Sequence, residues 1–150
     1  AADSVTFCLS KGLGAPAGSV LCGSEAFIRR AHRYRKMLGG GMRQVGVLGA
    51  AGLHALTHHR EGLADDHRRA KALATALAAL PGVELDPASV QTNIVIFTLA
   101  ERSPKALCAA VAGAVKVLPF GPAQVRAVFH RDVDDAGLER AIAAFQRALG

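Results

Sequence analysis

The sequence has little cysteine, few aromatic residues and no long hydrophobic run, and each shortage excludes a class of protein. Its 150 residues contain three cysteines, one tyrosine and no tryptophan. Cys8, Cys22 and Cys108 are too scattered for a disulfide scaffold and form no Cys-X-X-Cys pair that would indicate zinc, which favours a reducing, cytoplasmic environment. No stretch reaches the about twenty apolar residues of a membrane helix, and the N-terminus has no signal-peptide pattern. We therefore expect no membrane-spanning segment.

What the sequence does contain is enough apolar residues for a core, and a surplus of positive charge. Hydrophobic residues make up 51% of the chain, and 18 basic against 12 acidic residues give a formal net charge of +6. Five of the cations fall within one expected helix: Arg29, Arg30, Arg33, Arg35 and Lys36. They could contact nucleic-acid phosphates, but Tyr34 is the one aromatic residue among them for base stacking. A solvated helix face is the favoured interpretation, and no nucleic-acid partner is expected.

The apolar pattern and its glycine and proline breaks predict an α/β fold. Strands are expected at 4–9 and 19–22, followed by helices at 24–37, with Ser24 as N-cap, at 42–59 and at 63–80. Further strands are expected at 83–85, 93–99, 115–118 and 125–129, and further helices after Pro104 and at 134–149. The helix at 42–59 is rich in glycine and alanine, so it should pack closely against a neighbour. Two strands are too few to bury a sheet by themselves, so we expect other chains or a further part of the protein to complete the first half.

A lysine beside a glycine-rich loop is the first candidate for chemistry. Lys11 lies directly after the first expected strand, in the Ser10-Lys11 pair that stops it, and is followed by Gly12, Gly14 and Pro16. A lysine on such a constrained turn can form a Schiff base with a carbonyl group if its surroundings keep part of it neutral. A surface lysine beside a loop has the same pattern, so spacing alone leaves both interpretations open. A Walker phosphate loop is excluded, because no glycine precedes the lysine at the required spacing.

A triple glycine followed by an arginine is the second candidate. Gly39, Gly40 and Gly41 precede Arg43, and if they open the next helix their N–H groups and Arg43 suit an anion such as phosphate or carboxylate. A corner between two helices with a solvated arginine is the equal alternative.

Arg126 and three histidines complete the candidates. Arg126 lies inside the apolar strand 125–129, where it needs either a partner such as a carboxylate or a place on a solvent-facing edge strand. His54 and His58 have the i, i+4 spacing of metal ligands, and His59 follows them. No carboxylate or cysteine completes a ligand set, so we expect these histidines on a helix surface and no metal site.

Taken together, these segments resemble one enzyme family. The run DSVTFCLSKGLGAPAGSVLCGS at 3–24, followed by RKMLGGGMRQVG at 35–46, is similar to the low-specificity L-threonine aldolases, and QTNIVIF at 91–97 and VRAVFHRDV at 125–133 match the same family. The resemblance implies the C-terminal part of an α/β subunit of pyridoxal-phosphate fold type I. Residues 1–62 would be the tail of the large cofactor-binding domain, and 63–150 the small C-terminal α+β domain.

The resemblance also implies roles for individual residues. Lys11 would hold pyridoxal 5'-phosphate as a Schiff base, and Arg43 would lie near the cofactor or a neighbouring subunit's site. Lys36 would lie at the rim of the active site, and Arg126 would bind the substrate carboxylate. Phe129 departs from the family, which usually has a threonine at this position.

The implied activity is cleavage of L-threonine, L-allo-threonine and related β-hydroxy-α-amino acids to glycine and an aldehyde, in a cytoplasmic homotetramer built as a dimer of dimers. In the family, the aspartate that pairs with the pyridine nitrogen, the histidine stacked on the ring and the phosphate loop precede the lysine. The chain alone is therefore expected to be inactive. The alternatives are a related pyridoxal-phosphate lyase or racemase acting on another amino acid, and a non-catalytic module that binds an acidic partner through the cations at 29–36.

Overall fold

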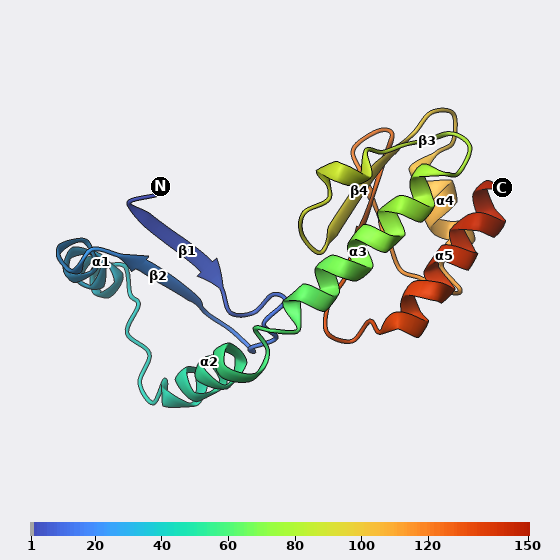
Figure 1. Cartoon of the computed structure of the whole chain (residues 1–150). Helices are drawn as coiled ribbons and strands as arrows, with labels where there is room; N and C mark the ends of the chain where they lie inside the picture. The colour runs from blue at the N-terminus through green and yellow to red at the C-terminus, as the bar shows by residue number, and fades with distance from the viewer. Residues whose placement is uncertain (1) are drawn as a thin grey trace. The chain divides into compact units, whose positions relative to one another are not determined.

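The computed structural model of the chain describes residues 2–150. Their contacts divide them into two compact units, with the boundary between Glu61 and Gly62. Figure 1 labels the elements of both units. None of the helices in this part of the chain is long and apolar enough to cross a lipid bilayer.

The first unit consists of a β-hairpin and two helices (Figure 1). Its elements are β1 (Ser4–Cys8), β2 (Ser19–Gly23), α1 (Glu25–Met37) and α2 (Gly46–His58). The strands pair antiparallel along their full length, and both lie where the sequence predicts them, to within one residue. Ser24 is the N-cap of α1, as predicted, and its Oγ accepts a hydrogen bond from Phe27 N–H at 3.3 Å.

The cationic helix α1 is exposed along its length. None of its residues is buried, and its five cations are open to solvent in this unit. Arg29 pairs with Glu25 one turn earlier, at 3.0 Å. Such an exposed pair stabilises a helix only slightly, and the arrangement is that of a solvated helix face.

The triple glycine ends α1 and does not open α2, which corrects the anion-site interpretation. Gly39, with φ +88°, donates to the Lys36 carbonyl at 3.2 Å, and Gly40 N–H donates to the Arg35 carbonyl at 2.8 Å. This pair of bonds is the Schellman motif that closes a helix C-terminus. Gly41 N–H also has a partner, the Gly39 carbonyl at 2.9 Å, so the three N–H groups are not free for an anion. Helix α2 begins only at Gly46, four residues later than predicted.

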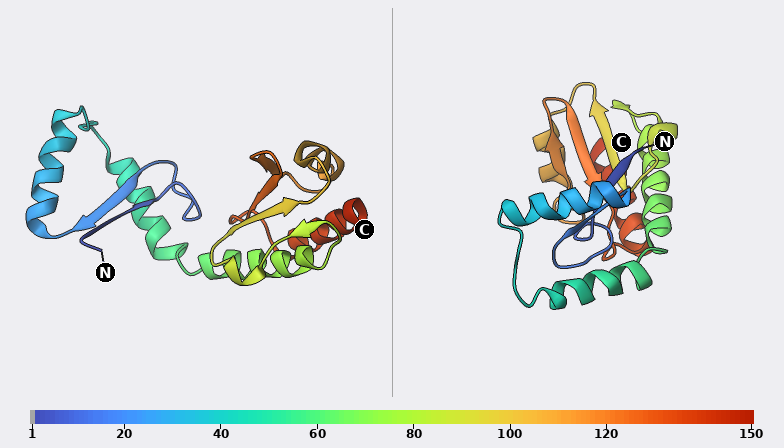
Figure 2. Two further views of the ribbon diagram at one scale, coloured as in Figure 1. Left: turned by 90° about the horizontal axis from the view of Figure 1, so that it is seen from above. Right: turned by 90° about the vertical axis from the view of Figure 1, so that its left-hand side faces the viewer.

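The second unit is a four-stranded antiparallel sheet packed with three helices. Its strand order is β3-β4-β6-β5, and Figure 2 shows α3 and α5 on the same side of the strands. The elements in chain order are α3 (Leu63–Ala78), β3 (Val83–Glu84), the short 3-10 helix η1 (Pro87–Ser89), β4 (Ile94–Leu99), α4 (Pro104–Val111), β5 (Leu118–Phe120), β6 (Gln124–Val128) and α5 (Asp135–Leu149). Helices α3 and α5 contact each other, and α4 contacts α5, β5 and β6.

Alternation along the two central strands places the core on the helix-covered face. In β4 every second residue is buried, and in β6 Val125 and Ala127 are buried while their neighbours are not. Phe97 of β4 meets Phe145 of α5 edge to face, with ring centroids 5.7 Å apart. Leu73 of α3 is 1% exposed in the same core. The other face of these strands carries no helix of this unit, and Arg126 is on that face.

Two expectations for this unit need correction. The strand predicted at 115–118 forms later, as β5, because the chain first continues the turn of α4: the N–H groups of Ala114 and Val115 both donate to the Val111 carbonyl. The helix predicted at 63–80 ends at Ala78. The last helix begins as expected, with Asp134 Oδ1 accepting from Gly137 N–H at 2.7 Å.

A charge cluster joins α3 to the first turn of α5 and gives the first prediction. Arg68 and Arg69 each donate to Asp135 Oδ1 at 2.8 Å, and the bond from Arg68, followed by that from Arg69, lowers the pKa of the Asp135 carboxyl below its usual 3.8. A carboxyl whose pKa is lower in the folded state stabilises the fold above its unfolded pKa and loses this contribution as the pH falls through its folded pKa. In Asp135→Asn, the free energy of unfolding should therefore decrease less steeply as the pH falls than it does in the parent protein.

The measurement is urea unfolding at a series of pH values from neutral down to about 2, which spans the pKa values involved. Glu139→Gln is the matched control, because Glu139 is an exposed carboxylate on the same helix and makes no ion pair within residues 2–150. If the free energy of unfolding falls equally steeply with decreasing pH in Asp135→Asn and in the parent protein, the Asp135 carboxylate does not stabilise the fold through Arg68 and Arg69.

Candidate functional site

Lys11 lies on a tight turn inside the loop at residues 9–18. Gly14 N–H donates to the Lys11 carbonyl at 2.8 Å and closes the turn, and Gly14 has φ +72°, which glycine adopts without strain. The base of the loop is closed by Ala15 N–H donating to the Leu9 carbonyl and Leu9 N–H donating to the Gly18 carbonyl, both at 2.9 Å. Lys11 itself is exposed. The loop therefore has defined geometry and presents a lysine that is accessible in this unit.

Helix α2 packs closely against this loop, as its composition predicts. A Cβ on Gly52 would lie only 3.0 Å from Leu9 Cδ1, so a larger residue there would force the side chain of Leu9 to move. Ala55, one turn later, is 1% exposed. At the end of the helix the His59 ring Nδ1 lies 2.7 Å from the Leu13 carbonyl oxygen. Gly52, Ala55 and His59 have i, i+3, i+7 spacing, so they share one helix face.

The three histidines do not have the same surroundings. His54 and His58 are exposed, as predicted, whereas the surface position predicted for His59 is wrong: it is half-buried and bonded to the loop. The ring of His54 lies 4.5 Å from that of His58 and 5.0 Å from that of His59, centroid to centroid. Within residues 2–150, no three His, Cys, Asp or Glu side chains come together as a metal site. The sequence signal that could have identified His59 is its position on the Gly52–Ala55 face.

Lys36 and Arg43 lie on either side of the triple glycine. Both are exposed, and the Lys36 ammonium lies over the glycines, because a Cβ on Gly41 would come within 2.7 Å of its Nζ. Arg43 is in the turn before α2, next to Gln44, whose φ of +50° is left-handed. No hydrogen bond or ion pair of residues 2–150 links Lys11, Lys36 and Arg43. The structure thus leaves all three cations open to external groups in this unit.

Arg126 lies on a central strand, which rules out the edge-strand alternative. Strand β6 pairs with β4 on one side and β5 on the other, and Arg126 is directly opposite Ile96 and Leu118. It is half-buried on the face that carries no helix, where Leu118 is 69% and Phe120 47% exposed. No ion pair or side-chain hydrogen bond of Arg126 occurs within residues 2–150. A guanidinium without a partner on an apolar face is suited to an external carboxylate.

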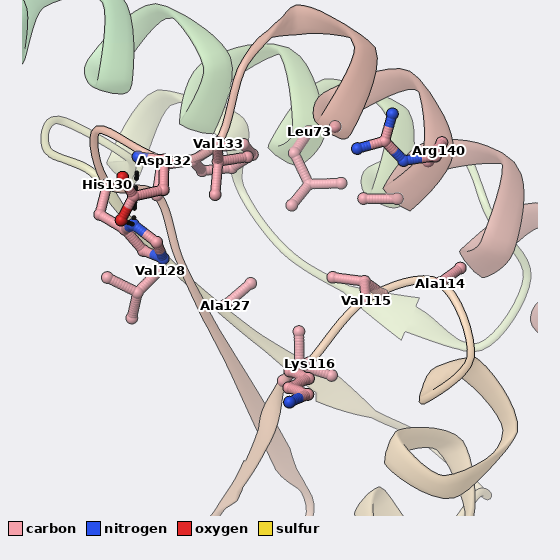
Figure 3. Close-up of a pocket in the computed structure, with 14 residues that line it drawn as sticks. Leu73, Ala114, Val115, Lys116, Ala127, Val128, His130, Asp132, Val133 and Arg140 are labelled. Atoms are coloured by element: carbon pink, nitrogen blue, oxygen red, sulfur yellow. Dashed lines mark hydrogen bonds and ion pairs between the residues drawn. The ribbon is translucent and has the colours of Figure 1, made fainter.

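The second unit also contains a cavity that is separate from these candidates. Its volume is about 260 Å³, and Figure 3 shows His130, Asp132, Arg140 and Lys116 among its lining side chains. His130 Nδ1 lies 3.4 Å from Asp132 Oδ2. Leu73 of α3 and Ala141 of α5 belong to the lining of the cavity, and Arg126 does not. The cavity is therefore on the helix side of the sheet, away from Arg126.

Comparison with known proteins gives matches along nearly the whole chain. The model of the beta-eliminating lyase family matches residues 1–100. The low-specificity L-threonine aldolase 1 of Arabidopsis thaliana is 40% identical over 99% of this chain, and the low specificity L-threonine aldolase of Escherichia coli K12 is 40% identical over 98% of it. Each alignment covers 43% of the relative, so this chain spans less than half the length of these curated relatives. The predicted resemblance to low-specificity L-threonine aldolases is confirmed.

The solved structures agree on the fold. A structure from Listeria monocytogenes, provisionally described as an L-allo-threonine aldolase, superposes with a TM-score of 0.78 at 19% identity and covers 98% of this chain and 45% of its own. The likeness confirms the predicted fold class, which is the α/β fold of pyridoxal-phosphate fold type I subunits.

Proposed function

The chain belongs to the beta-eliminating lyase family, and we propose that it is the C-terminal part of a pyridoxal-phosphate-dependent aldolase. The full protein would cleave L-threonine, L-allo-threonine and related β-hydroxy-α-amino acids to glycine and an aldehyde. The observation that carries the proposal is the 40% identity to threonine aldolases over 98–99% of the chain. It is supported by the accessible Lys11 on a glycine turn and by Arg126, which has no ion-pair or side-chain hydrogen-bond partner within residues 2–150.

We further propose that residues 1–62 are the tail of the large domain and 63–150 the small C-terminal domain. The boundary between the two compact units, which lies between Glu61 and Gly62, supports this assignment. So does the hairpin of the first unit, in which Val5 is 53% and Leu21 43% exposed, as expected for strands that belong to a larger sheet. A cytoplasmic homotetramer, built as a dimer of dimers, completes the proposal.

The residues present fit pyridoxal phosphate on three counts. The Lys11 amine can bond to the aldehyde of the cofactor, and Lys11 is exposed and makes no ion pair within residues 2–150 that would block this contact. Arg43 suits the phosphate or a carboxylate, and Lys36 would lie at the rim of the site. When bound, the cofactor supplies the electron sink that makes cleavage of the Cα–Cβ bond possible.

The chain's own residues then have three tasks. Lys11 Nζ would hold the cofactor and, when the substrate amine takes its place there, would accept the proton that this amine gives up. As an ammonium it could then deliver that proton to the substrate Cα. Arg126 binds the substrate carboxylate with two parallel N–H donors and so fixes the orientation of the bonds at Cα. The loop at 9–18 holds the backbone of Lys11 in place through its internal hydrogen bonds.

The test is a comparison of two products made by the full-length protein loaded with pyridoxal phosphate. Glycine and acetaldehyde from L-threonine are expected, whereas pyruvate from L-serine would identify a lyase acting on another amino acid. The 150-residue chain alone is the control and should give neither product. A full-length protein that binds the cofactor and forms no glycine from L-threonine or L-allo-threonine would contradict the aldolase proposal.

A further inference from the structure

One hydrogen bond joins the Lys11 loop to helix α2 across 46 positions of sequence. The His59 ring Nδ1 lies 2.7 Å from the carbonyl oxygen of Leu13, two residues after Lys11. A carbonyl oxygen can only accept, so the ring donates, and Nδ1 carries the proton. The edge of the His54 ring meets His59 at 84°, with centroids 5.0 Å apart. The tautomer and the orientation of the His59 ring therefore both have a structural cause.

The loop needs such an external restraint because its own sequence is flexible. Gly12 and Gly14 flank Leu13, and glycine loses more conformational freedom on folding than any other residue. The remaining backbone bonds of the loop, from Gly14 to Lys11, Ala15 to Leu9 and Leu9 to Gly18, are internal to it. They give the loop its shape, and the Leu9–Gly18 bond extends the pairing of β1 with β2, while Leu13 and Ala15 are each buried to 7% exposure. Within residues 2–150, the bond from His59 is the one side-chain hydrogen bond to residues 9–18.

Helix α2 contacts the loop at two points on one face. Gly52 allows the helix to approach Leu9, and His59, two turns later, bonds to Leu13 on the far side of Lys11. The loop is thus held on both sides of the lysine. Packing at Leu9 is not directional, whereas the hydrogen bond at Leu13 fixes the plane of a peptide group close to Lys11.

We propose that His59 is a positioning residue for Lys11: its Nδ1–H bond to the Leu13 carbonyl holds the turn so that the lysine amine meets the cofactor aldehyde in a reactive orientation. This inference rests on the proposed function only for the identity of the aldehyde. The hydrogen bond and its effect on the loop can be measured without turnover.

Two substitutions separate the hydrogen bond from the packing of the ring. His59→Phe keeps an aromatic ring beside His54 and removes the donor. His59→Asn removes the ring and keeps a donor, since the Asn Nδ2 atom occupies the position of the His Nδ1 atom. His58→Phe is the matched control, because His58 is an exposed imidazole on the same turn and is not bonded to the loop.

The experiment uses the full-length protein with pyridoxal phosphate and three readouts: amide hydrogen exchange at residues 12–15, the fraction of cofactor trapped on Lys11 by borohydride, and kcat and KM for L-threonine. A net hydrogen bond corresponds to about a three- to tenfold effect. His59→Phe should speed the exchange and lower kcat by that factor with KM little changed, and should spread the borohydride label to other lysines. His59→Asn and His58→Phe should resemble the parent protein.

The proposal would be overturned if the two variants behaved the other way round. If His59→Phe resembles the parent protein, and His59→Asn has faster amide exchange at residues 12–15 and a lower kcat, His59 acts through the packing of its ring. Wild-type exchange at residues 12–15 in His59→Phe would overturn it as well. A third outcome is that the parent protein traps no cofactor on Lys11, while His59→Phe still speeds amide exchange of the loop. This result would contradict the proposed cofactor site but support the role of His59 in holding the loop.

Discussion

Replacing Lys11 by alanine is expected to lower kcat for L-threonine by about three orders of magnitude or more, because the chain then lacks the amine that bonds to the cofactor aldehyde. Lys11→Arg should be equally inactive: a guanidinium keeps the charge but does not deprotonate to a nucleophile at neutral pH. Neither change should unfold the protein, since Lys11 is exposed and its side chain makes no hydrogen bond within residues 2–150.

The measurement pairs steady-state kinetics with borohydride reduction and peptide mapping. The parent protein should carry the reduced cofactor on Lys11, and both variants should lose it there. Lys105→Ala is the matched control, because Lys105 is an exposed lysine on α4 and should retain full activity and labelling of Lys11. In the parent protein, labelling spread evenly over the five lysines of residues 1–150 would remove Lys11 from the site, and so would a Lys11→Ala variant that retains turnover.

The elements of this fold could be predicted where local chemistry decides them. Ser24 and Asp134 cap helices in the structure because an N-cap side chain bonds to N–H groups only three residues away. Strand β4 is visible in the sequence as a run of apolar residues with β-branched and aromatic side chains. These signals lie within a few residues, so no knowledge of tertiary structure is required.

The corrections concern features that depend on more distant parts of the chain. The triple glycine is a good opening for α2 by sequence, but the N–H groups of Gly39 and Gly40 bond to carbonyls of α1, and that of Gly41 bonds to the Gly39 carbonyl. The position of Arg126 depends on strand order, and β6 becomes central only because β5 pairs with its outer side. His59 bonds to a backbone carbonyl 46 residues away, and a backbone acceptor leaves no trace in the side-chain sequence.

The family resemblance and the geometry carry different parts of the site. Resemblance alone identifies Lys11, Lys36, Arg43 and Arg126 as a set, since they are spread over two units and no contact within residues 2–150 joins the first three. Geometry adds what the resemblance does not contain, namely which backbone groups hold the Lys11 turn and which face of the sheet carries Arg126. Lys11 and Arg126 lie in different units, so the substitutions at the two residues test their roles separately.

Arg126→Leu is expected to raise KM for L-threonine by about 10- to 100-fold, because it removes a charge-assisted contact to the substrate carboxylate worth about 1.5–3 kcal/mol in total. Arg126→Lys keeps the charge but loses the fork, so it should fall between the parent and Arg126→Leu. The melting temperature should change little, since Arg126 has no internal ion pair within residues 2–150 whose loss would leave a buried charge.

The measurement that separates a carboxylate contact from a general loss of function is a second substrate. A β-hydroxy amine that lacks the carboxylate has nothing for Arg126 to bind, so its slow cleavage by the parent protein and by Arg126→Leu should be equal. Arg147→Leu, an exposed arginine on α5, is the control for loss of positive charge and should leave KM unchanged. If Arg126→Leu impairs both substrates alike, the guanidinium does not act through the carboxylate. If it impairs neither, Arg126 lies outside the site, and the sheet face that carries it needs another explanation for an unpaired arginine among apolar side chains.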